Sequence, residues 1–99
     1  MPVVDVELTI STAPGERLAF EPAEPTIRAT GPISLTFHNG SSLAHNMTFT
    51  AGLEAGTRTI VRPGTSDQLL LAPPPPGDYP FVCTIHDGMA GRLIIEPAA

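Results

Sequence analysis

The chain has 99 residues and a formal net charge of −5, which leaves room for one hydrophobic core and predicts a single domain over residues 1–99. The negative charge argues against partners such as nucleic acid or an anionic membrane surface. No apolar run approaches the roughly 18 residues of a membrane span, and the absence of lysine excludes Schiff-base chemistry.

Alternating apolar and polar residues predict short strands in the first half of the chain. Residues 4–10 alternate with a period of two and are followed by a turn at residues 11–15. Residues 33–38 carry the clearest strand pattern, and residues 45–50 are predicted to form the next strand after a turn. Two shorter strands are expected at residues 17–20 and 26–29.

The second half is less regular. Residues 51–66 predict a loop or one helical turn, followed by a strand near residues 59–62. Residues 68–71 are a short apolar run, predicted to be a buried strand, and the four prolines of residues 73–76 predict a surface polyproline II segment. The last two strands are expected at residues 79–83 and 93–95.

Seven to nine short strands with turn residues between them predict an all-β fold, an antiparallel Greek-key β-sandwich. The 12 prolines and 9 glycines agree with this prediction, because they favour strands joined by turns over helices.

The chemistry of the chain is concentrated between its last two strands. Cys83, His86 and Met89 form the pattern Cys-x2-His-x2-Met, and Cys83 is the only cysteine, so no internal disulfide competes for it. A thiolate, an imidazole and a thioether are soft donors suited to copper, and a tight loop can direct all three at one point. His45 is the candidate for a second imidazole.

Each of these residues also has an ordinary structural interpretation. A lone buried cysteine is usually inert core filling, and methionine often fills irregular gaps. Met47 is predicted to be such a core residue, His38 to be an exposed histidine on the polar side of its strand, and Asp87 to be a solvated loop residue. The joint spacing of Cys83 and the residues after it favours the metal site.

Four segments in chain order resemble the cupredoxins, the small blue copper proteins, and most closely the plastocyanin and amicyanin group. They are Phe37-His38-Asn39-Gly40, Ala44-His45-Asn46-Met47, Tyr79-Pro80-Phe81-Val82-Cys83-Thr84-Ile85-His86 and Met89-Ala90-Gly91. The resemblance implies a cupredoxin-like fold and one type 1 copper ion.

The same resemblance implies a role for each residue. His45, Cys83 and His86 would form a trigonal plane around copper, with Met89 as the long axial ligand. Asn46 and Thr84 match the pair that ties the first ligand strand to the cysteine loop. Two departures bear on the reduction potential: Ile85 stands where the plastocyanin and amicyanin group that the chain resembles has proline, and Ala44 where plastocyanin has proline.

We therefore expect a mononuclear copper electron carrier, not an enzyme. Its donor and acceptor, both redox proteins, would dock transiently at the His86 face, and the acidic chain would favour a basic partner. The expected docking surface comprises Leu43, Ala44, Ile85, Gly88 and Ala90. The chain is expected to be a monomer.

Other functions remain open at this stage. One is copper delivery or storage, another is an electron-transfer domain cut from a larger membrane-tethered redox protein, and a third is a metal-free interaction domain. A copper enzyme is disfavoured because the chain has three histidines and two are already assigned. A Cys83–His86 nucleophile pair is disfavoured by the neighbouring Met89.

The N-terminal segment has neither a basic nor an apolar region typical of a signal peptide. A periplasmic or extracytoplasmic location is expected from the family resemblance alone.

Overall fold

The computed structural model describes residues 6–28, 31–72 and 75–97. Eight strands occur in this part of the chain: β1 (Val6–Thr12), β2 (Phe20–Glu21), β3 (Thr26–Arg28), β4 (Ile33–His38), β5 (Thr48–Phe49), β6 (Ser66–Leu71), β7 (Gly77–Val82) and β8 (Ala90–Glu96). Across these described segments, no helix is long and apolar enough to cross a membrane.

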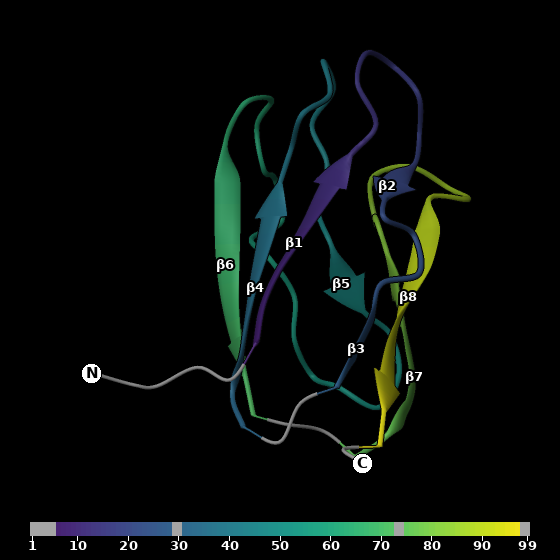
Figure 1. Ribbon diagram of the computed structural model, residues 1–99. Coiled ribbons are helices and arrows are strands. Elements are labelled where there is room, and N and C mark those ends of the chain that lie inside the picture. The colour runs from purple at the N-terminus through teal and green to yellow at the C-terminus, as the bar shows by residue number, and fades with distance from the viewer. Residues whose placement is uncertain (1–5, 29–30, 73–74, 98–99) are drawn as a thin grey trace.

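The strands form two four-stranded sheets that face each other (Figure 1). One sheet has the order β2-β1-β4-β6 and the other the order β3-β8-β7-β5. The predicted all-β sandwich is confirmed. Its pairing departs from the antiparallel expectation at two places, because β1 pairs with β4, and β3 with β8, in parallel.

Alternation along the strands places a continuous apolar core between the sheets. Phe81 lies at its centre, with its ring 4.9 Å from Phe20 and 5.6 Å from Phe49, both in edge-on arrangements. Phe37 adds a further edge-on contact to Phe20, at 6.0 Å. Met47 is fully buried, as predicted.

Several predicted boundaries are wrong. The turn expected at residues 11–15 begins later, because Ser11 and Thr12 still belong to β1. The strand expected at residues 17–20 is a loop that reaches a strand only at Phe20, and its backbone hydrogen bonds are turn-like, with the Ala19 N–H donating to the Arg17 carbonyl.

The strand expected at residues 59–62 is reduced to one bridge between Val61 and His45. The Thr59 carbonyl accepts a hydrogen bond from the Asn46 side chain instead of a neighbouring strand, which prevents a longer ladder. Residues 51–65, all of them described, contain no helix, so the loop alternative holds.

Residues 68–71 do form a strand, but the prediction that it is buried is wrong. Leu70 is 60% exposed, while Leu71 is buried. β6 lies at the edge of its sheet, and one of its faces meets solvent. Of the predicted polyproline segment, residues 73–74 lie outside the described residues, and Pro75 and Pro76 are exposed.

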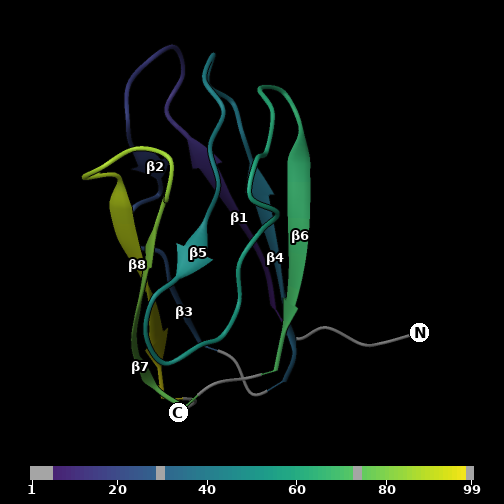
Figure 2. The ribbon, with the colours of Figure 1, turned by 180° about the vertical axis from the view of Figure 1, so that it is seen from behind.

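The connections that follow β1, β4 and β7 gather at one end of the sandwich, the top in Figures 1 and 2. Two of these connections, residues 39–47 and 83–89, carry all the predicted metal ligands. The fold therefore brings together two segments that are about 40 residues apart in the sequence.

Candidate metal centre

The loop from β7 to β8 holds two of the predicted ligands in the interior. Cys83 and Met89 are buried, with exposed fractions of 4% and 1%. The Cys83 N–H donates to the Met89 carbonyl at 3.0 Å and closes the loop at its base. Gly88, just before Met89, has φ +81°, a conformation that favours glycine and turns the chain back toward the core.

His45 enters the site from the connection between β4 and β5. Its backbone exchanges two hydrogen bonds with Val61, of 3.2 and 2.8 Å, and its side chain is fully buried. The His45 Nδ1 lies 3.7 Å from the Cys83 Sγ.

This separation fits a shared metal ion. Bonds of about 2.3 Å to sulfur and 2.0 Å to nitrogen, as in zinc sites, would separate the donors by about 3.7 Å at a trigonal angle. The thioether of Met89 completes a soft donor set of the kind that copper prefers. His45, Cys83 and Met89 therefore form one buried cluster whose chemistry fits copper.

His86 lies beside this cluster, with its ring nitrogen Nε2 in contact with a backbone carbonyl. Its ring centroid is 4.8 Å from that of His45, and its Nε2 lies 3.0 Å from the Ala44 carbonyl oxygen. Among the residues that the structure describes, no three imidazole, thiol or carboxylate groups converge at metal-binding distance. His86 is thus near the site but not gathered with Cys83 and His45 into one ligand group.

Asn46 and Thr84 are brought together across the two connections. The Asn46 Nδ2 donates to the Thr84 Oγ1 at 2.7 Å, and the Thr84 N–H donates to the Asn46 Oδ1 at 2.9 Å. These residues directly follow His45 and Cys83, so the reciprocal bonds fix the spacing between the two candidate ligands. The predicted contact between the segments is present.

The environment of His45 favours its neutral form. Burial, and secondarily the charge of nearby His86, lower the pKa of His45 below its ordinary value of 6.5. Its Nε2 is buried without a hydrogen-bond partner among the described residues. A neutral imidazole is the form that binds a metal, so the site is prepared for metal at neutral pH.

The lowered pKa predicts how the stability of the apoprotein depends on pH. As pH falls below 6.5, the unfolded chain takes up a proton at His45 before the folded chain does. The free energy of unfolding should therefore be highest above this pH and fall by up to about 1.4 kcal/mol per pH unit below it. Urea unfolding of the apoprotein between pH 8 and pH 5 would measure this slope.

One variant tests the assignment of this slope. His45→Gln should flatten it, because glutamine has no imidazole to take up the proton. An equal slope in the wild type and His45→Gln would contradict the assignment.

The predicted docking residues have mixed exposure. Ile85 is 41% exposed, Gly88 and Ala90 are exposed, and Leu43 and Ala44 are half-buried. Ile85 therefore presents an apolar side chain to solvent beside the cysteine loop. The Ala44 backbone carbonyl, an acceptor that a proline at this position would also have, is the hydrogen-bond partner of His86.

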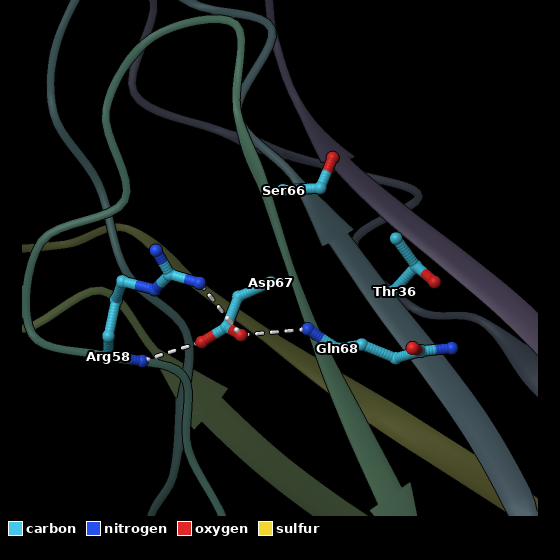
Figure 3. Close-up of a pocket in the computed structure, with 5 residues that line it drawn as sticks. All are labelled: Thr36, Arg58, Ser66, Asp67 and Gln68. Carbon is cyan, nitrogen blue, oxygen red and sulfur yellow. Dashed lines mark hydrogen bonds and ion pairs between the residues drawn. The ribbon is translucent and has the colours of Figure 1, made fainter.

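A depression of about 400 Å³ lies elsewhere, against β4 and β6, and is lined by Thr36, Arg58, Ser66, Asp67 and Gln68 (Figure 3). The Asp67 carboxylate is occupied there by Arg58 and by the Gln68 N–H. Hydrogen bonds from these groups lower the pKa of Asp67. None of the predicted ligands lines this depression.

Sequence reasoning missed two residues that support His45. Val61 was predicted to lie in a short strand and Asn39 in a turn. Both are buried, the Asn39 side chain donates a hydrogen bond to the Val61 carbonyl, and Val61 exchanges backbone hydrogen bonds with His45. A turn asparagine is usually solvated, and only its place in the Phe37-His38-Asn39-Gly40 motif hinted at more.

Comparisons with known proteins bear on the family and the fold of the chain. A family profile described as a cupredoxin-like domain matches residues 4–95. The chain is similar to the dithionite-reduced auracyanin of the photosynthetic bacterium Roseiflexus castenholzii, at 25% identity and a TM-score of 0.78, over 96% of this chain and 100% of that one. No match is found among curated protein sequences.

Two other solved structures share the fold. Auracyanin A, described as a "blue" copper protein from the green thermophilic photosynthetic bacterium Chloroflexus aurantiacus, has 20% identity and a TM-score of 0.75, over 91% of this chain and 98% of that one. A variant amicyanin in its reduced Cu(I) form has 25% identity and a TM-score of 0.70, over 95% of this chain and 86% of that one.

Proposed function

Because the chain belongs to the family of cupredoxin-like domains, we propose that it is a mononuclear blue copper protein that carries single electrons between redox partners. The observation that carries the proposal is the buried pair of Cys83 Sγ and His45 Nδ1, 3.7 Å apart. The similar auracyanin and amicyanin structures are described in reduced forms, and one of these descriptions names Cu(I).

Four residues would hold the ion: His45, Cys83 and Met89 from the buried cluster, and His86 from its edge. Copper, when bound, supplies the one-electron chemistry. The residues of this chain supply a dry, fixed donor set, because His45 is fully buried and Cys83 and Met89 nearly so. The connections at residues 39–47 and 83–89 are joined by the hydrogen bonds between Asn46 and Thr84. These bonds would hold the donor atoms in the same positions when the copper changes its oxidation state.

We propose that His86 would bind the copper ion through its Nδ1 atom. The Ala44 carbonyl can only accept a hydrogen bond, so the His86 Nε2, 3.0 Å away, carries the proton. This tautomer leaves the Nδ1 lone pair free for a metal. The half-buried imidazole then offers an edge of the site that reaches solvent.

The partners would dock around this edge. Exposed Ile85, together with Gly88, Ala90 and the half-buried Leu43 and Ala44, offers a small apolar surface suited to brief contacts. The net charge of −5 favours a basic partner and predicts that association weakens with salt. We place the protein, as a monomer, in the periplasm or another extracytoplasmic compartment on the family resemblance.

A copper delivery or storage role is the second candidate. Delivery requires copper that exchanges readily, whereas a buried thiolate donor favours retention. The same electron-carrier domain could also be part of a larger membrane-tethered redox protein. The rate at which a chelator removes copper separates carrier from delivery protein.

Titration of the apoprotein with Cu(II) tests the proposal. One equivalent should produce an intense visible band from thiolate-to-copper charge transfer and a narrow copper hyperfine splitting in the electron paramagnetic resonance spectrum. A colourless product, or binding at a stoichiometry other than one, would overturn the electron-carrier proposal.

A further inference from the structure

Asn39, the residue after β4, is fully buried and uses its whole side-chain amide. Its Oδ1 accepts hydrogen bonds from the Thr12 Oγ1 at 3.1 Å and from the Ser41 N–H and Oγ, each at 3.0 Å. Its Nδ2 donates to the carbonyl oxygens of Leu43 and Val61, each at 2.8 Å. The opposite amide orientation would set donors against donors, so this one is fixed.

The two carbonyl groups that Asn39 binds flank His45. Leu43 precedes His45 by two residues, and Val61 exchanges both backbone hydrogen bonds with His45. One amide therefore holds the segment before His45 and the Val61 segment opposite it at the same time. The Asn39 backbone adds two more bonds, its N–H to the Thr65 carbonyl at 2.9 Å and its carbonyl from the Gly64 N–H at 2.7 Å.

None of these bonds uses an atom that would bind metal. They can therefore form before copper arrives, and they connect the His45 segment through Thr12 to β1. We propose that Asn39 is a positioning residue that presets the His45 imidazole beside Cys83 in the metal-free protein. The identity of the metal in this inference rests on the proposed function.

Removing the Asn39 amide should affect the His45 segment more than the rest of the fold. In Asn39→Ala, the carbonyl groups of Leu43 and Val61 lose their shared donor, although Ser41 Oγ still reaches the Leu43 carbonyl at 2.9 Å. The Val61 carbonyl keeps only the longer 3.2 Å bond from the His45 N–H. The His45 segment should therefore loosen more than the rest of the fold.

The test compares Asn39→Ala with Leu71→Ala, a cavity variant of similar expected cost. Leu71 is buried and pairs with Ile33 at the start of β4, the opposite end of that strand from Asn39. Thr12→Val removes one donor to Asn39 and the acceptor of the Gly40 N–H while it keeps the side-chain shape, and it serves as a milder variant if Asn39→Ala does not fold.

Two readouts are used on each protein. Amide hydrogen exchange of the apoprotein is followed at His45 and Val61 and compared with Leu35 in the core of β4. Cu(II) affinity and the copper hyperfine splitting are then measured on the same samples. Asn39→Ala should lose protection at His45 and Val61 beyond the loss at Leu35, bind Cu(II) about 10- to 100-fold more weakly than Leu71→Ala, and show an altered splitting.

Exchange, affinity and splitting equal to those of Leu71→Ala would overturn the inference and leave Asn39 as a residue of general stability. If Asn39→Ala does not fold, Thr12→Val decides the question. A Cu(II) affinity and an exchange protection at His45 that both equal those of the wild type would overturn the inference. A wild-type protein that forms no blue site would overturn the proposed function, while the exchange data would still decide whether Asn39 holds the His45 segment.

Discussion

Replacement of Cys83 by serine should abolish the intense visible band of the copper-loaded protein and leave at most a weak, broad-splitting Cu(II) signal. The thiolate is the only sulfur donor in this chain that binds as an anion, and a serine hydroxyl stays protonated and binds copper poorly. Because Cys83 is buried 3.7 Å from His45 Nδ1, no other group takes its place in the cluster. Visible absorption and electron paramagnetic resonance after addition of one equivalent of Cu(II) measure the effect.

Met89 and Met47, both buried, provide matched controls for this prediction. Met89→Leu should keep the band but shift it, since it removes the weak axial donor, whereas Met47→Leu changes a fully buried core residue and should leave the spectrum unchanged. An intense blue band in Cys83→Ser, or a spectrum altered as much by Met47→Leu as by Met89→Leu, would show that copper binds elsewhere.

Replacement of Gly91 by alanine should cost at least about 3 kcal/mol of unfolding free energy, at the upper end of overpacking changes. A Cβ at Gly91 would lie 2.7 Å from two ring atoms of Phe81 and even closer to the Ala23 carbonyl oxygen. Neither neighbour can yield easily, because the Phe81 ring is packed at the centre of the core and the Ala23 carbonyl accepts a hydrogen bond from the Arg92 N–H. For a domain of this size the Tm should fall by more than about 12 °C.

Gly40→Ala is the control for this change. Its added Cβ would make only ordinary contacts, the nearest at 3.6 Å to the Thr12 carbonyl oxygen, and Gly40 does not have a positive φ. Thermal unfolding of the two apoprotein variants should therefore differ by most of the predicted shift. Equal Tm values would mean that the strands around Gly91 separate at little cost.

The strand pattern of this chain was largely readable from local sequence. Alternation in residues 33–38 predicted the bounds of β4 correctly. β4 pairs with β1 on one side and with β6 on the other, and its apolar residues Ile33, Leu35 and Phe37 are buried. The prediction failed for residues 59–62 and for Leu70. At residues 59–62 the Thr59 carbonyl is bonded to the Asn46 side chain and not to a neighbouring strand. Leu70 is exposed because it lies on the edge strand β6 and faces solvent.

The candidate site divides in the same way. The donor types and their spacing from Cys83 to Met89 are local, so the sequence indicated a soft metal loop and the structure places Cys83 and Met89 in the interior. The bond between Asn46 and Thr84 was expected only through the family resemblance, and the structure contains it. The contact of the His86 Nε2 with the Ala44 carbonyl had no local signal, because it joins residues 42 positions apart.

The sequence by itself determined the all-β class and the positions of most strands, and it indicated four candidate donor side chains, because these follow from alternation and from residue chemistry. Only the tertiary structure decided the parallel pairing of β1 with β4, the burial of Asn39, and the 3.7 Å approach of His45 to Cys83. Each of these joins distant segments: 27 residues separate Thr12 from Asn39, 22 separate Asn39 from Val61, and 38 separate His45 from Cys83. Hydrogen bonding and packing between such distant segments depend on the whole sandwich, and no neighbouring residue encodes them.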